Sequence, residues 1–141
     1  MNRIPVIILL LALVLASCSK QDATPVTPVN NPVDTLAAQR RYTGSFVNGP
    51  FGNVSGQAAV YRTDSGWVLA LEAVNISNGP DLHVYLSKEI QPSTFLDLGR
   101  LQSVAGTQQY NVPGNPDFSQ YRYALVHCKQ FNHLFGSAEL R

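Results

Sequence analysis

The 141-residue chain is poor in the residues that most often carry chemistry or bind nucleic acid. It has two cysteines, one tryptophan and three histidines, and only 13% of its residues are charged. With a net charge of +1 it offers no strongly basic face for nucleic acid. It also lacks a G-x-S-x-G elbow, an H-E-x-x-H helix, a Walker loop and a paired-cysteine redox motif. Nothing in the sequence argues for an enzyme, and the question stays open.

Residues 4–17, which follow Arg3, contain no charged side chain. Residues 4–17 are mainly apolar and end in Leu15-Ala16-Ser17, directly before Cys18. A short apolar run after one positive residue, closed by small residues, is typical of a secretory signal. It is too short for a bilayer span, which needs about 20 residues. The cysteine makes the segment resemble a bacterial lipoprotein signal, whereas the other interpretation is an ordinary signal peptide with a chance cysteine.

The lipoprotein interpretation fixes where the mature chain begins and where it is held. It predicts a signal peptide at residues 1–17 and acyl chains on Cys18, so the protein is anchored to the bacterial cell envelope, outside the cytoplasm, without spanning the membrane. Ser19, where an aspartate would favour the inner membrane, favours the outer membrane. Removing residues 1–17 deletes Arg3 alone among the charged residues and leaves nine positive and nine negative side chains.

The chain then divides into a spacer and one domain. Residues 18–40 have few large apolar side chains and carry Pro25, Pro28 and Pro32 among threonine and asparagine. Such a segment cannot bury enough apolar surface to fold, so we expect a flexible tether. Residues 41–141 remain as one small domain with one core.

Within this domain apolar residues recur with a period of two. The pattern predicts strands at residues 54–62, 67–74, 81–87, 96–101, 108–112, 121–128 and 137–140. In the second of these, Trp67, Leu69, Leu71 and Ala73 are expected on one face. Short strands with turn residues between them, and no helical period, predict an all-β fold, a small antiparallel β-sandwich or barrel.

Four motifs occur in a fixed order along the domain. They are Gly79-Pro80-Asp81-Leu82, Leu98-Gly99-Arg100-Leu101, Gly106-Thr107-Gln108-Gln109-Tyr110-Asn111-Val112-Pro113, and Cys128 followed by Phe131 and Phe135-Gly136-Ser137-Ala138-Glu139-Leu140. Together they resemble the DM-thirteen domain family across residues 42–141. The resemblance implies an electron-transfer role centred on Cys128, with Asp81 as the G-P-D-L carboxylate, and admits haem or another redox group without naming one. Relatives often have tryptophan before the cysteine, whereas this chain has His127.

Cys128 has no partner left within its own chain if Cys18 takes lipid. Three interpretations remain open for it: a buried thiol that acts as a small apolar side chain, a redox or cofactor-binding sulfur, and an intermolecular bridge. The sequence places His127 and His133 nearby, and thiolate with imidazole suits copper or zinc. Because His127 and Cys128 are adjacent on a strand, they should face opposite ways, so we expect no metal site and histidines at the surface or at strand ends.

The remaining candidates are polar residues near the G-P-D-L motif. Asp81 is interpreted either as a turn carboxylate bonded to nearby N–H groups or, with His127, as part of a ligand-binding site. His83 and Tyr85 alternate with the apolar stripe of residues 82, 84 and 86. We expect them to face solvent, the alternative being a binding surface.

Two functional hypotheses follow from these residues. The first is a cell-envelope lipoprotein with a redox or electron-transfer accessory domain centred on Cys128. The alternative is a non-catalytic ligand- or protein-binding module of the adhesion type, with a structural, buried cysteine. Under either hypothesis the expected partners of the protein are the membrane, through the lipid anchor, and a redox or binding partner in the envelope, but no nucleic acid.

Overall fold

The computed structural model describes residues 23–141. In this part of the chain no helix is long and apolar enough to cross a bilayer. The regular structure consists of nine β-strands: β1 (Val29–Asn30), β2 (Ala38–Asn48), β3 (Val54–Thr63), β4 (Gly66–Ile76), β5 (Leu82–Ser87), β6 (Phe95–Arg100), β7 (Ala105–Val112), β8 (Tyr123–Cys128) and β9 (His133–Glu139).

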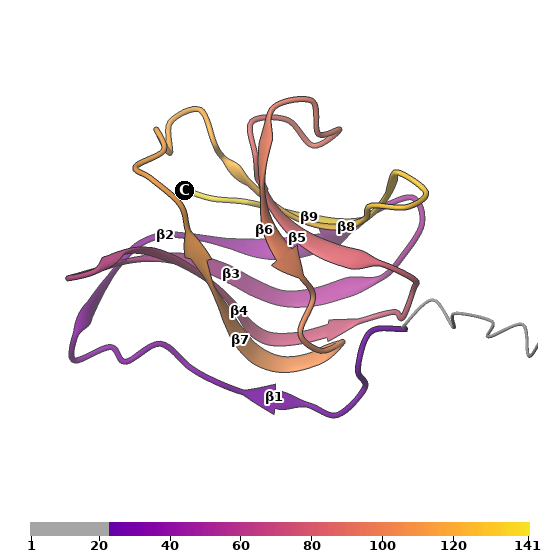
Figure 1. Ribbon diagram of the computed structural model, residues 1–141, viewed down its shortest axis with the longest axis horizontal. Helices are drawn as coiled ribbons and strands as arrows, with labels where there is room; N and C mark the ends of the chain where they lie inside the picture. The colour runs from indigo at the N-terminus through magenta and orange to yellow at the C-terminus, as the bar shows by residue number, and fades with distance from the viewer. Residues whose placement is uncertain (1–22) are drawn as a thin grey trace, which may run out of the picture.

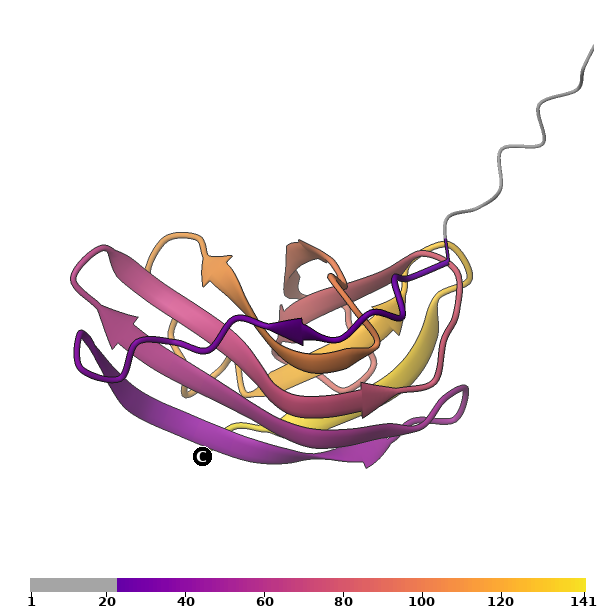
Figure 2. The same cartoon turned by 90° about the horizontal axis from the view of Figure 1, so that it is seen from below.

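All nine strands form one curled sheet, in the order β1-β7-β4-β3-β2-β9-β8-β5-β6 (Figure 1). Neighbouring strands are antiparallel, except that β1 runs parallel to β7. The long strand β2 joins the two halves of the sheet, because most of it pairs with β3 and its last residues, Phe46–Asn48, pair with β9. Figure 2 shows the resulting trough. The predicted all-β antiparallel fold is confirmed, and its form is a half-barrel.

The core lies on the concave face of the sheet. Alternate residues of β3, β4, β5, β8 and β9 meet there, and the predicted stripe of Leu82, Val84 and Leu86 is almost completely buried. On β4 the alternation fails at Ala73, which is exposed and has a φ of 47°. The register between β4 and β7 shifts between Leu71 and Val74, so a bulge turns Ala73 away from the face on which it was expected.

A short link, residues 101–104, connects β6 to β7 across the mouth of the trough, and Gln108 on β7 holds it. The Gln108 side chain is fully buried. Its Oε1 accepts hydrogen bonds from the N–H groups of Gln102 (3.0 Å) and Ser103 (3.2 Å) and from the Tyr110 hydroxyl (2.7 Å). Its Nε2 donates to the Ser103 carbonyl at 2.8 Å. This bonding explains how a polar side chain is accommodated inside the fold.

Residues 23–31, which we call the strap, lie along the sheet, where the sequence predicts a flexible tether. The Asn31 N–H donates to the Thr107 carbonyl at 2.8 Å, and Pro25 accepts from the Val104 N–H at 3.0 Å. Further along, β2 begins at Ala38. The structure therefore differs from the expected tether in its described part, because backbone hydrogen bonds hold the strap where apolar periodicity gives no signal.

Gly106 is what allows the strap to approach β7. Its φ is 102°, and a Cβ at this position would lie 2.0 Å from the carbonyl oxygen of Val29. Only glycine leaves room for that pairing. The signal peptide at residues 1–17 and the lipidation candidate Cys18 lie outside the described residues.

Candidate functional site

The turn of residues 78–81, between β4 and β5, covers the end of β8. Gly79 lies so close to Phe135 of β9 that a Cβ would be 2.5 Å from its ring. The carbonyl of Pro80 accepts a hydrogen bond from the Cys128 thiol, with 3.0 Å between sulfur and oxygen. The G-P-D-L motif therefore forms the cover of the cysteine.

Asp81 is the residue of this turn whose side chain enters a charged cluster. It has a φ of 52°, a conformation that aspartate tolerates better than most residues, and its carbonyl accepts from the Lys129 N–H at 3.0 Å. Its Oδ1 lies 3.1 Å from His83 Nε2 and 3.3 Å from the Arg100 guanidinium. The carboxylate thus contacts side chains rather than the neighbouring backbone N–H groups that the turn interpretation predicted.

His83 lies between two carboxylates. Its Nδ1 is 2.8 Å from Asp97 Oδ1, and its Nε2 faces Asp81. A neutral imidazole has one N–H and can donate to only one of the two carboxylates, whereas an imidazolium can donate to both. Lys129 Nζ lies 3.1 Å from Asp97 Oδ2. Partial burial raises the pKa of Asp97, but hydrogen bonds from His83, the Gly99 N–H and Lys129 outweigh it and hold this pKa below its ordinary value.

The outer face of β5 is buried as well, so the expected solvent exposure of His83 and Tyr85 is wrong. Tyr85 is 2% exposed and stacks between Phe95 and His127, with ring centroids 4.3 Å and 5.1 Å away. The physical reason is that the adjacent strand β6 places Phe95 over it. Burial, followed by the negative charges of Asp97 and Asp81, raises the pKa of Tyr85 to about 12, which keeps the phenol protonated.

His127 is also buried, although a surface or strand-end position was expected. It is 2% exposed, faces His83 across the β5–β8 pair, and makes no hydrogen bond through either ring nitrogen within residues 23–141. Burial above all, and then the nearby imidazoles of His133 and His83, lower the pKa of His127. The nearby backbone of Cys128 raises this pKa in part. The contact is too poorly aligned to count as a hydrogen bond. The ring is therefore neutral at pH 7.

Cys128 points into the core from the opposite face of β8. It is 1% exposed and pairs with Leu82. His127 and Cys128 diverge, as strand geometry predicts. No group of three or more ligating side chains in residues 23–141 could hold a metal ion. Because the thiol is enclosed and bonded to Pro80, the surrounding residues do not fit haem or another group bound through this sulfur.

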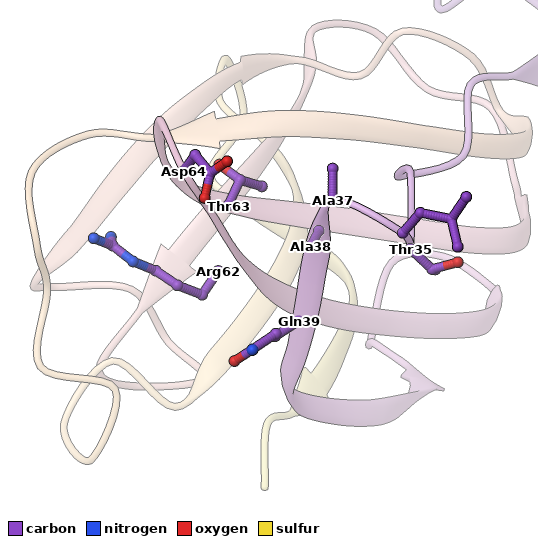
Figure 3. Close-up of a pocket in the computed structure, with 8 residues that line it drawn as sticks. Thr35, Ala37, Ala38, Gln39, Arg62, Thr63 and Asp64 are labelled. Atoms are coloured by element: carbon purple, nitrogen blue, oxygen red, sulfur yellow. The ribbon is translucent and has the colours of Figure 1, made fainter.

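A hollow of the described surface lies elsewhere, and it contains no residue singled out from the sequence. It measures about 580 Å³ and is lined by residues 35–39 together with Arg62, Thr63 and Asp64 (Figure 3). These residues lie at the start of β2 and at the β3–β4 turn, whereas Cys128 lies under the turn that follows the other end of β4. The hollow therefore plays no part in the site around Cys128.

Sequence reasoning missed Asp97, Lys129 and Gln108. A signal for Asp97 was present, because it alternates with Leu96 and Leu98 and therefore faces away from their side of β6. Its pairing with the His83 strand could not be inferred without knowing that β5 and β6 are neighbours. Gln108 stood inside a family motif, yet only the fold reveals that it ties a link across the trough.

These features define a class of protein: a small all-β module in which turn and strand motifs pack around the one buried thiol of residues 23–141. The chain matches the family described as "Electron transfer DM13" over residues 45–140, and it belongs to that family. No curated protein and no solved structure matches it. The strap precedes the matched range, although its hydrogen bonds make it part of the same sheet.

Proposed function

We propose that the protein is a lipoprotein of the bacterial cell envelope, acylated at Cys18, whose DM13 domain serves as an accessory in electron transfer. The family description supports the electron-transfer role. The apolar run that ends at Cys18 supports export and anchoring, and Ser19 supports the outer membrane. The electron partner would be another protein of the envelope.

Cys128 is proposed as the redox-responsive group of this domain. The observation that carries this proposal is that two of the family motifs meet at the thiol: Pro80 accepts its hydrogen bond, and Gly79 of the same turn packs against Phe135, which lies in the same core cluster as Cys128. A lone thiol can be oxidised reversibly by a peroxide: the S–H becomes a sulfenic acid S–OH, the peroxide is reduced to water or an alcohol, and a thiol reductant restores the S–H. The oxidant must reach the sulfur, which the Pro80 carbonyl and the core cover. Redox chemistry at Cys128 therefore requires the turn of residues 78–81 to move.

The second candidate is a non-catalytic ligand- or protein-binding module with a structural Cys128. The burial of the sulfur favours it, because a thiol that is 1% exposed behaves as a small apolar side chain. In this alternative neither Asp81 nor His127 is available to a ligand in the present conformation. Asp81 contacts His83 and Arg100, and the His127 ring is buried. A ligand of these residues would have to displace the existing contacts.

The two functions separate in one set of experiments on protein carrying Cys18→Ser, in which Cys128 is the only thiol. The electron-transfer function, with Cys128 as its redox-responsive group, predicts that a peroxide converts Cys128 of the folded protein to a sulfenic acid, which mass spectrometry detects and dithiothreitol reverses, and that Cys128→Ser shows no such change. This substitution keeps a hydroxyl that can donate to Pro80. The electron-transfer function also predicts that iodoacetamide labels Cys128 of the folded domain at a slow but measurable rate.

The opposite result would favour the binding module. It consists of no oxidation of the folded protein by peroxide, labelling only after denaturation, and clear destabilisation by Cys128→Ala. Removing a buried core side chain typically costs a few kcal/mol, so the urea midpoint of Cys128→Ala reports directly on a structural role.

A further inference from the structure

Three rings form a continuous row at one end of the sheet. Phe51 stacks on His133 with centroids 3.6 Å apart, and Phe131 lies 6.0 Å from His133. Phe51 is 53% exposed and Phe131 is 52% exposed. Single exposed apolar side chains are ordinary, but two phenylalanines joined through a third ring make a small apolar surface. We call these residues the aromatic row.

The aromatic row lies at the end of the molecule where the strap begins. Asn53, next to the turn that carries Phe51, donates its N–H to the Ser77 hydroxyl at 2.9 Å. The following turn is held by the strap, because Asn78 Nδ2 donates to the Thr24 carbonyl at 3.1 Å and Pro80 forms a bridge with Ala23. Figures 1 and 2 show the start of the strap and the β8–β9 turn toward the same end of the sheet, separated from one another in the view of Figure 1.

The length of chain before the strap limits how far this end can be from a lipid anchor. Cys18 and Ala23 are five residue steps apart in the sequence. Even fully extended, five residues reach at most about 18 Å. With the acyl chains of Cys18 in the bilayer, this end of the domain must stay close to the headgroups.

The chemistry of the row suits a lipid surface. Aromatic side chains favour the membrane interface, where they bury apolar area among the headgroups. Lys129, two residues before Phe131, and Arg100 at the end of β6 already face Asp97 and Asp81, so their attraction to anionic lipid should be a minor contribution. Two half-exposed rings fall far short of the roughly 1,200 Å² that a specific protein interface needs, which argues against a second copy of the chain.

We propose that the aromatic row of Phe51, His133 and Phe131 is a membrane-contact surface that holds the anchored domain end-on against the bilayer. This inference rests on the acylation of Cys18 put forward under the proposed function. The anchor keeps the row at high local concentration near the lipid, so the weak affinity of two rings suffices.

The test uses the full lipoprotein, purified in detergent and reconstituted into vesicles of phosphatidylethanolamine and phosphatidylglycerol. Phe131→Trp introduces an indole at the row, and the wild-type protein, whose single tryptophan is Trp67 near the far end of β4, is the control. Brominated lipids should quench the emission added by Phe131→Trp and leave that of Trp67 unchanged. Adding Phe51→Ser should reduce this quenching, whereas Leu36→Ser, at a 98% exposed site at the start of β2, should not.

Each result bears on a separate part of the proposal. Equal quenching of the two indoles, or none of either, in protein whose acylation is verified by mass spectrometry would overturn the membrane-contact surface while leaving the lipoprotein intact. An emission shift that depends on protein concentration in lipid-free detergent would assign the row to a second copy instead. Absence of acylation would refute the anchor, and the variant mixed with preformed vesicles would then have to be quenched for the surface to stand.

Discussion

The imidazole of His127 packs against Tyr85 while neither ring nitrogen is hydrogen-bonded to the rest of the described chain. Burying a polar group without a partner costs about 1–3 kcal/mol. Burial also lowers its pKa, so below pH of about 6.5 the unfolded chain binds a proton that the folded domain does not. Because only the unfolded chain takes up this proton, the free energy of unfolding falls as the pH drops below about 6.5.

His127→Phe should stabilise the domain, because it keeps a flat ring on Tyr85 and removes both unpaired nitrogens. We expect a gain of about 1 kcal/mol at pH 7.5 and a larger gain at pH 5, measured by urea unfolding. His127→Leu tests whether the flat ring matters. An equal gain at both pH values would show that the acid sensitivity has another origin.

Gln108 shows the opposite situation, a buried polar side chain with all its partners. Gln108→Ala leaves the Ser103 N–H and the Tyr110 hydroxyl without their acceptor and should cost about 2–4 kcal/mol in the free energy of unfolding. The Gln102 N–H keeps the Tyr110 oxygen as an acceptor. Gln109→Ala is the matched control, because the adjacent glutamine is partly exposed and its Nε2 bonds to Asn31. Its cost should stay below about 1 kcal/mol. Equal effects of the two substitutions would mean that Gln108 does not hold the link.

Among the elements, the strap depends on one backbone position. Gly106→Ala would place a methyl group 2.0 Å from the Val29 carbonyl oxygen, so β1 should detach from β7. We expect the Asn31 amide, which donates to Thr107, to lose its protection in hydrogen exchange while the core strands keep theirs.

Gly99→Ala is the control for this substitution. Its φ of 114° imposes similar backbone strain, but no atom lies within 4 Å of the added methyl group. It should therefore leave the Asn31 amide protected. Persistent protection in Gly106→Ala would show that the strap tolerates the methyl group or is held mainly by its other contacts.

The sequence predicted best the positions of the strands that form the hairpin around residues 63–66. β3 and β4 begin and end within two residues of expectation. Their second face is not wholly polar, because Ala59, Tyr61 and Ala70 form a separate buried cluster there. The outer face of the β5–β8 pair is buried as well, because Phe95 of β6 stacks on Tyr85. Alternation alone assigns one face of a strand to solvent. It therefore predicted exposed positions for His83, Tyr85 and His127, but the structure buries all three.

The candidate site was predicted only in part for the same reason. Cys128 and Asp81 were singled out because motifs marked them, whereas their partners lie on strands whose neighbours the sequence does not specify. Asp97 reaches His83 through the β5–β6 pairing, and Pro80 reaches Cys128 through the β5–β8 pairing. Long-range pairing of this kind leaves no local pattern to read.

At the scale of the whole molecule, anchoring is tested at two adjacent positions. Cys18→Ser should abolish acylation and move the protein out of the detergent phase. Ser19→Asp should leave the lipid in place and shift the protein from the outer to the inner membrane, by the sorting rule that favours aspartate there. Mass spectrometry of the N-terminus and membrane fractionation measure the two outcomes. Unmodified, soluble wild-type protein would contradict the lipoprotein assignment.

The strap also decides which molecules the domain can meet. A free spacer of about 22 residues could extend to roughly 70 Å as polyproline II and sweep a large volume. Because the strap is bound to the sheet, the segment that separates Cys18 from the domain is only five residue steps long. Diffusion of the proposed lipoprotein then becomes two-dimensional, and encounters are confined to components of its own leaflet. Within that layer, tethering gives local concentrations up to the millimolar range, so a partner need bind only weakly to stay engaged.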